Sequence, residues 1–68
     1  MIAVNKLRGI IAEQGTSQRA VAVHLGMTEN TFYRKMKRGV FDSDEISEMI
    51  TLLNIQNPNE IFFANLGA

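Results

Sequence analysis

The sequence predicts an all-α fold built from five short helices, and three observations support this prediction. Apolar residues recur at spacings of three and four positions, which places them on one face of a helix. Glycine, proline and residues that favour helix N-caps divide the chain into segments of helical length. No stretch keeps a clean alternation of apolar and polar residues, and no Asn-Gly or Asp-Gly pair marks a hairpin turn. With 68 residues, the chain is expected to form a single compact domain over residues 1–68.

The first expected helix covers residues 3–14 and ends at Gly15, which accepts the left-handed conformation found after helix C-termini. Leu7 and Ile11 lie four positions apart and form its apolar face. Gly9, in the middle of this helix, costs about 1 kcal/mol of helix propensity. A close crossing with another helix is one reason for a glycine at this position.

The second and third expected helices meet at a tight corner. The earlier one begins after Ser17, a favoured N-cap, and continues to about Leu25. Gly26 forms the corner, and Thr28 then caps a helix that ends at Gly39. The apolar positions expected to lie in the core are Val21, Ala22, Leu25, Phe32 and Met36.

The fourth expected helix has the clearest start signal in the chain. Asp42 is its N-cap and Glu45 completes a capping box, while Phe41 is placed to pack on Ile46. Just before it, Val40 is expected to pack back against the end of the preceding helix.

A fifth, short helix is expected after Asn57-Pro58, which combine an N-cap with a proline at the first helical position. Its large apolar residues are Ile61, Phe62, Phe63 and Leu66. They form more apolar surface than one short helix usually buries, so we expect a homodimer interface there. Burial within a single chain is the alternative.

Charge is distributed unevenly although the formal net charge is zero. All seven basic residues lie in positions 1–38 with only two acids, whereas positions 39–68 hold five acids and no base. Such a distribution can orient a small domain on a polyanion with its acidic end turned away.

Composition argues against several classes of site. Without cysteine and with a single histidine, His24, the chain offers neither a disulfide framework nor a Cys/His zinc site. The acids near Asp42 are explained by the positive end of a helix, so we expect no metal. No nucleophile–base pair and no glycine-rich phosphate loop is found, and we expect no catalytic residues, cofactor or small-molecule ligand. Apolar runs are far shorter than the roughly 18 residues of a membrane span, and no signal-peptide core is present, which predicts a cytoplasmic protein.

Residues 18–37, QRAVAVHLGMTENTFYRKMK, combine the features of a helix-turn-helix. Ala22 is small where the second helix must cross the first, and Gly26 allows the tight corner. The segment resembles the helix-turn-helix of phage Cro and CI repressors at Ser17-Gln18, Val21-Ala22, Leu25-Gly26-Met27-Thr28 and Phe32. The flanking segments that resemble small Cro-like phage regulators are Asn5-Lys6-Leu7, Phe41…Glu45-Ile46 and Ile61-Phe62-Phe63.

This resemblance implies a five-helix, lambda-repressor-like domain that binds operator DNA as a homodimer in a bacterial or phage-infected cell. The chain departs from the family pattern at one place. Three positions after Phe32, where many members carry an apolar residue, it has Lys35, and Met36 follows.

Position on the third helix assigns the expected DNA contacts, because residues near the start of a recognition helix reach base edges. Base contacts are expected from Thr28, Glu29, Asn30, Tyr33, Arg34 and Lys37. Asn30 can pair with adenine and Arg34 with guanine. Glu29 can accept from a cytosine amine, although stabilising the helix start is an equal alternative.

Phosphate contacts are expected from Gln18, as the resemblance implies, and from Arg19, Lys35 and Arg38. The alternative for the three cations is that they are only solvated charge. With about three or four phosphate contacts per chain, a plot of log binding constant against log salt concentration would have a slope of about −5 to −7 for a dimer.

Two classes of function therefore remain open. The leading prediction is a sequence-specific regulator of transcription that inserts its third helix into the major groove of double-stranded operator DNA. The alternative is an antirepressor-like module that binds another phage or bacterial regulator with the same fold. The zero net charge and the apolar fifth helix favour this alternative.

Overall fold

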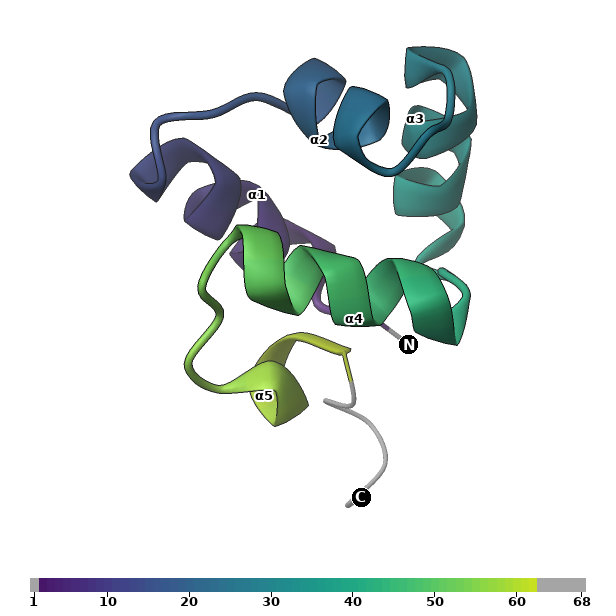
Figure 1. The fold of residues 1–68 in the computed structure, drawn as a ribbon. Helices are drawn as coiled ribbons and strands as arrows, with labels where there is room; N and C mark the ends of the chain where they lie inside the picture. Colours follow the sequence, from purple (N-terminus) through teal and green to yellow (C-terminus); the bar gives the residue numbers. More distant parts are fainter. Residues whose placement is uncertain (1, 63–68) are drawn as a thin grey trace.

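The structure is a computed structural model, and it describes residues 2–62. Its five helices are α1 (Val4–Glu13), α2 (Gln18–His24), α3 (Glu29–Arg38), α4 (Ser43–Leu52) and α5 (Pro58–Phe62). Between residues 2 and 62 there is no strand, and the predicted all-helical class is confirmed. α2 packs against α3, and α1 packs against α5 (Figure 1).

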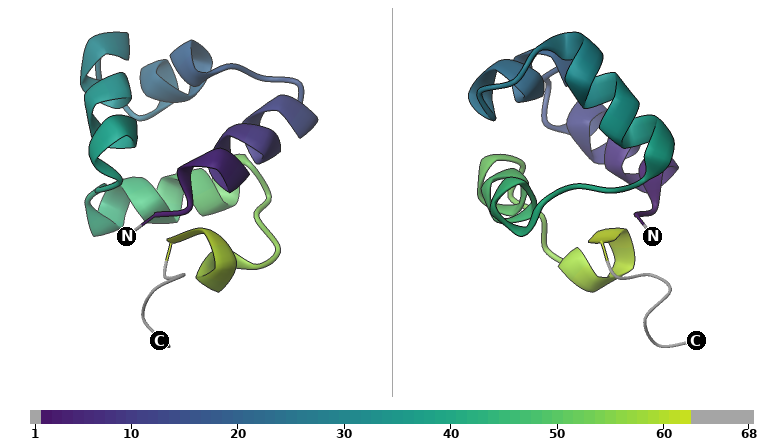
Figure 2. Two further views of the ribbon diagram at one scale, coloured as in Figure 1. Left: turned by 180° about the vertical axis from the view of Figure 1, so that it is seen from behind. Right: turned by 90° about the vertical axis from the view of Figure 1, so that its right-hand side faces the viewer.

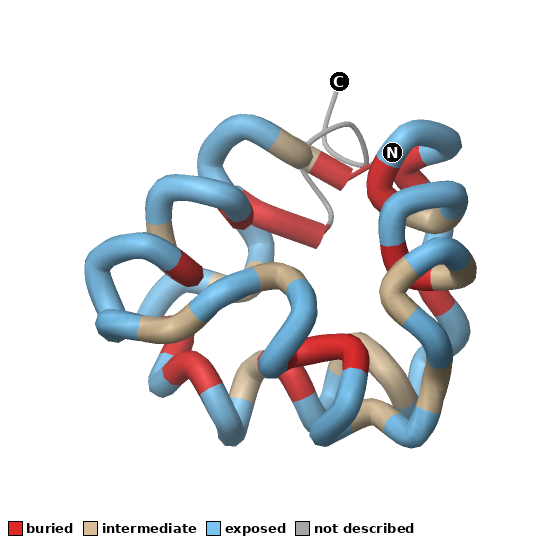
Figure 3. The backbone as a smooth tube through the Cα atoms, turned by 90° about the horizontal axis from the view of Figure 1, so that it is seen from above, coloured by how far each residue is buried: buried red, intermediate tan, exposed pale blue. Residues whose placement is uncertain are grey.

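The apolar faces of all five helices meet in one core. Phe32 of α3 is fully buried, and its ring packs against Phe41 with the ring centroids 5.5 Å apart. In α1 and α3 the two buried residues lie four positions apart with exposed residues between them, as an amphipathic helix requires (Figure 3). The core comprises Ile2, Leu7, Ile11, Val21, Ala22, Phe32, Met36, Phe41, Met49, Leu53, Ile55, Ile61 and Phe62.

Side-chain caps begin the central helices where the sequence predicts them. The Ser17 hydroxyl accepts a hydrogen bond from the backbone N–H of Ala20 at 3.1 Å, which fixes the start of α2. At the start of α4, the Glu45 carboxylate accepts from the backbone N–H of Asp42 at 2.8 Å, as in a capping box.

The corner between α2 and α3 is a Schellman motif, in which a left-handed residue lets the chain turn back on the last helical carbonyls. Gly26 has φ of 75° and donates its N–H to the carbonyl of Val23 at 3.0 Å. Met27 donates its N–H to the carbonyl of Ala22 at 3.0 Å. The same left-handed conformation follows α1, α3 and α4, at Gly15, Gly39 and Asn54.

Asn54 ends α4 without the help of a glycine. Its φ is 51°, a conformation that asparagine tolerates better than most residues. Ile55 then donates its N–H to the carbonyl of Ile50 at 3.0 Å. The Gln56 amide donates to both the backbone and side-chain oxygens of Asn54, at 3.1 and 3.0 Å.

The segment before α1 joins two distant parts of the fold. Ile2 donates its N–H to the carbonyl of Gly39, at the end of α3, over 3.2 Å. The next residue, Ala3, donates to the carbonyl of Ile61 in α5 over 2.7 Å. The start of α1 therefore lies between the α3–α4 junction and α5 (Figure 2).

Two local expectations were wrong. Val40 does not pack back on α3 but is 62% exposed, because its partner position in the Schellman motif is Lys35 rather than an apolar residue. Phe41, the next residue, enters the core instead. Gly9 does not mark a close helix crossing, since a Cβ added there would meet nothing within 4 Å.

Two of the four residues expected at the dimer interface lie in the core of the single chain, which was the alternative for them. Ile61 and Phe62 are each 4% exposed and belong to the core of the single chain, because α5 packs against α1. A chain this short needs those side chains to complete its own core. The other two expected interface residues, Phe63 and Leu66, lie outside the described residues.

Replacing Gly26 and Gly9 by alanine should have opposite effects on stability. Gly26→Ala places a Cβ in a left-handed position and should lower the free energy of unfolding by about 1–2 kcal/mol. Gly9→Ala, in the exposed middle of α1, should raise it by about 0.5–1 kcal/mol. Urea unfolding followed by circular dichroism measures both, and effects of the same sign would contradict this description of the corner.

Candidate nucleic-acid interface

The exposed face of α3 carries four of the six side chains expected to contact bases. Phe32 and Met36 hold the opposite face in the core. The exposed residues follow the i, i+3, i+4, i+7 spacing of one helix stripe and are Asn30, Tyr33, Arg34 and Lys37. The core-facing pair therefore determines which side chains α3 presents outward.

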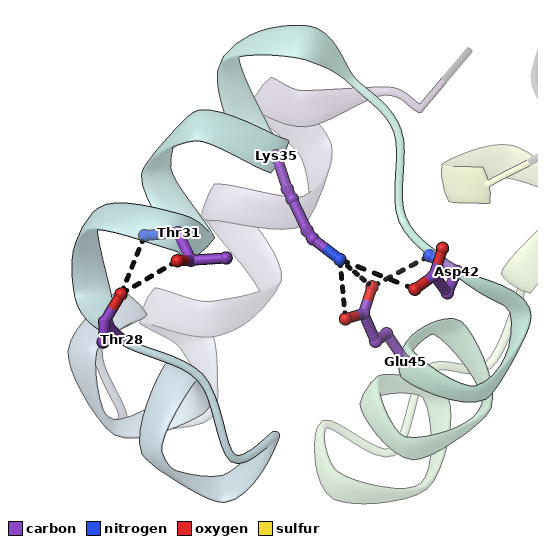
Figure 4. Close-up of polar contacts among 5 residues, drawn as sticks. All are labelled: Thr28, Thr31, Lys35, Asp42 and Glu45. Atoms are coloured by element: carbon purple, nitrogen blue, oxygen red, sulfur yellow. Dashed lines mark hydrogen bonds and ion pairs between the residues drawn. The ribbon is translucent and has the colours of Figure 1, made fainter.

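Thr28 acts as the N-cap of α3. Its hydroxyl oxygen accepts from the backbone N–H of Thr31 at 3.2 Å, and its hydroxyl proton is donated to the Thr31 hydroxyl at 2.9 Å (Figure 4). With that proton engaged, Thr28 has only acceptor capacity left for a ligand.

Glu29 and Tyr33 form a pair on the first turns of α3. The Tyr33 hydroxyl donates to Oε2 of Glu29 at 2.8 Å, across the i, i+4 spacing of the helix. This hydrogen bond, together with the negative charge of Glu29, raises the pKa of Tyr33. Tyr33 is 46% exposed, and Glu29 is half-buried.

Lys35 lies in a different place from the one expected of a phosphate contact. Its Nζ donates to both carboxylate oxygens of Glu45, at 2.7 and 2.8 Å, and lies 3.7 Å from the carboxylate of Asp42 (Figure 4). The half-buried ammonium therefore joins α3 to the start of α4. Its charge is already compensated by carboxylates of the same chain.

The sequence contained a signal for this ion pair. A lysine at a position where related patterns are apolar indicates a side chain that points partly inward, where it needs a partner. The acids of the capping box at the start of α4 provide one.

The remaining phosphate-contact candidates lie at both ends of the helix pair. Arg19 on α2 and Arg38 at the end of α3 are exposed. Gln18, the first residue of α2, is half-buried, and its Oε1 is enclosed without a hydrogen-bond partner among residues 2–62. Arg38 also lines a surface hollow of about 270 Å³ together with Lys35, Val40 and Asp42.

At the junction of α3 and α4, the two charge types of the sequence are not separated in space. The acidic start of α4 lies beside the basic end of α3, as the contact between Lys35 and Asp42 demonstrates. The expectation of an acidic end turned away from the basic one is therefore wrong for this part of the fold. The connection between α3 and α4 is only four residues long and brings the two charge types together.

Searches for other kinds of site and for known relatives were negative. Between residues 2 and 62 no group of three or more His, Cys, Asp or Glu side chains is arranged to hold a metal ion. No helix in that range is long and apolar enough to cross a membrane. Comparisons with known protein families, with curated proteins and with solved structures find no match.

The ion pair between Lys35 and Glu45 gives a prediction for stability against pH. Partial burial opposes the charge of Glu45, but the Lys35 ammonium and the Asp42 N–H outweigh it and lower the pKa of this carboxyl. The hydrogen bond to Glu45 raises the pKa of Lys35. A lowered carboxyl pKa stabilises the fold above its ordinary value of 4.5, and this contribution is lost as pH falls through the lowered value.

Glu45→Gln should therefore lower the free energy of unfolding at neutral pH by up to about 1 kcal/mol, and less at high salt. Glutamine keeps the capping-box hydrogen bond, so the change reports mainly the lost charge. The difference from the original protein should disappear in strong acid, where Glu45 is itself protonated. Glu48→Gln, at an exposed position of the same helix, is the control. A pH-independent difference for Glu45→Gln would refute the assigned ion pair.

Proposed function

We propose that the protein is a sequence-specific regulator of transcription that binds double-stranded DNA by inserting α3 into the major groove. The observation that carries this proposal is the single exposed stripe of Asn30, Tyr33, Arg34 and Lys37 on α3. These side chains can hydrogen-bond base edges, and α2 packs across the same helix as in a helix-turn-helix.

The roles of individual residues follow from their chemistry. Arg34 has the fork of donors that fits guanine, and Asn30 has the donor and acceptor that fit adenine. Phosphate contacts fall to the Gln18 amide and to Arg19 and Arg38, which lie on either side of the stripe in sequence. Lys37, two turns into α3, can reach either a base edge or a phosphate.

Dimeric binding to a two-fold operator is part of the proposal. One recognition helix reads only a few base pairs, and two copies double the site while matching its symmetry. Ile61 and Phe62 are buried in the chain itself, so the proposed dimer does not use them. The exposed apolar residues Val23, Val40 and Leu52 remain available on the surface.

A protein-binding function is the second candidate, and one observation favours it. Val23 on α2 is 72% exposed and offers an apolar contact on the outer side of the helix pair. Together with zero net charge and the compensated charge of Lys35, this fits a module that binds another regulator.

Binding-site selection from a random duplex pool, followed by titration of the selected DNA, tests the proposal. The double variant Arg34→Ala, Lys37→Ala should weaken binding to the selected site by on the order of 10²-fold. Lys6→Ala, Arg8→Ala removes the same charge from the exposed face of α1 and should have a much smaller effect. A two-fold-symmetric consensus is expected.

The salt dependence of the same titration provides a second result. With Lys35 withdrawn, the cations proposed to contact phosphates are Arg19, Arg38 and Lys37. Three such contacts per chain in a dimer correspond to a slope of log binding constant against log salt concentration of about −5. If no duplex is enriched even at low salt, the DNA-binding proposal is wrong and the protein-binding function remains.

A further inference from the structure

The hydrogen bond between Tyr33 and Glu29 determines what this part of α3 can offer to a ligand. Tyr33 uses its only proton on Oε2 of Glu29. The lone pairs of the phenol oxygen and of Oε1 of the carboxylate are left. Both groups therefore present acceptors, and neither presents a donor.

The position of the pair matches the part of a recognition helix that reaches bases. Glu29 is the first residue of α3, directly after its N-cap Thr28. Side chains on a helix lean toward its N-terminus, and the Tyr33 hydroxyl accordingly reaches back to the first turn. Because the hydrogen bond to Tyr33 already restricts the Glu29 side chain, Glu29 loses less rotamer entropy when it binds a ligand.

We propose that Glu29 reads the exocyclic amine of a cytosine in the major groove, and that Tyr33 is the positioning residue that fixes its carboxylate. This inference rests on the proposed DNA-binding function. It adds one specified base to the operator and gives Tyr33 a role other than the expected direct base contact.

Cytosine is the base that fits a group made only of acceptors. In the major groove, cytosine presents an amine donor, whereas guanine presents two acceptors and thymine an acceptor and a methyl group. Adenine presents a donor beside an acceptor, N7, which a carboxylate would repel. A pair of side chains that offers only acceptors therefore matches cytosine. The acceptors of the other three bases repel it.

Glu29→Gln provides the sharpest test because it changes the hydrogen-bonding pattern and keeps the size of the side chain. The variant also removes one negative charge, which should strengthen binding to all sequences alike and leave the base preference at other positions unchanged. A glutamine amide has one acceptor and one donor group, which match the amine and N7 of adenine. Binding-site selection with this variant should replace cytosine by adenine at one position of each half-site. The rest of the consensus should be unchanged.

Tyr33→Phe separates positioning from direct contact. The variant keeps the ring but removes the hydroxyl that holds Glu29. The preference for cytosine at that same position should fall by on the order of severalfold to tenfold, with no change at other positions. A structural defect would instead weaken binding to all sites equally. Asn30→Ala is the matched control and should relax a different position.

The outcomes distinguish this inference from the function on which it rests. If the original protein enriches no sequence, DNA binding itself fails. If it enriches a consensus that Glu29→Gln leaves unchanged, the regulator proposal survives and the reading of cytosine by Glu29 is overturned. If Glu29→Gln moves the preference to adenine but Tyr33→Phe has no effect, the positioning role of Tyr33 is overturned.

Discussion

The orientation of α3 depends on the left-handed residue at Gly26 together with the burial of Phe32. Gly26 turns the chain through the α2–α3 corner, and Phe32 fixes which side of α3 enters the core. Once those two constraints hold, the helix period alone places Asn30 and Arg34 outward. The proposed reading surface is thus a geometric consequence of the core.

The contact of Lys35 with Glu45 adds a second constraint on the same helix. It holds the middle of α3 to the start of α4, and it also removes one cation from the outer surface. A chain with zero net charge is attracted only weakly to a polyanion at long range. Binding by such a protein would depend more on hydrogen bonds to bases than on the number of phosphate contacts, which agrees with an acceptor pair such as Glu29–Tyr33.

Features that depend on nearby sequence could be predicted, and features that depend on distant neighbours could not. The caps at Ser17 and Thr28 and the corner at Gly26 involve residues within a few positions of one another, and the structure confirms them. The exposure of Val40 and the burial of Phe62 depend on what packs there from elsewhere in the chain. Partner-dependent positions of this kind carry no local signal.

The same distinction applies to the candidate site. The stripe on α3 is predictable from helix period. A lysine at position 35 indicates a side chain that needs a partner, but identifying Glu45 as that partner requires knowing how α3 lies against α4. The most direct test of the reading surface is to follow backbone amide NMR signals as a selected operator duplex is added. The largest changes should fall at residues 18–19 and 28–38, with residues 58–62 little affected. Changes concentrated in α4 and α5, with α3 unmoved, would contradict the assignment of α3 as the DNA-reading helix.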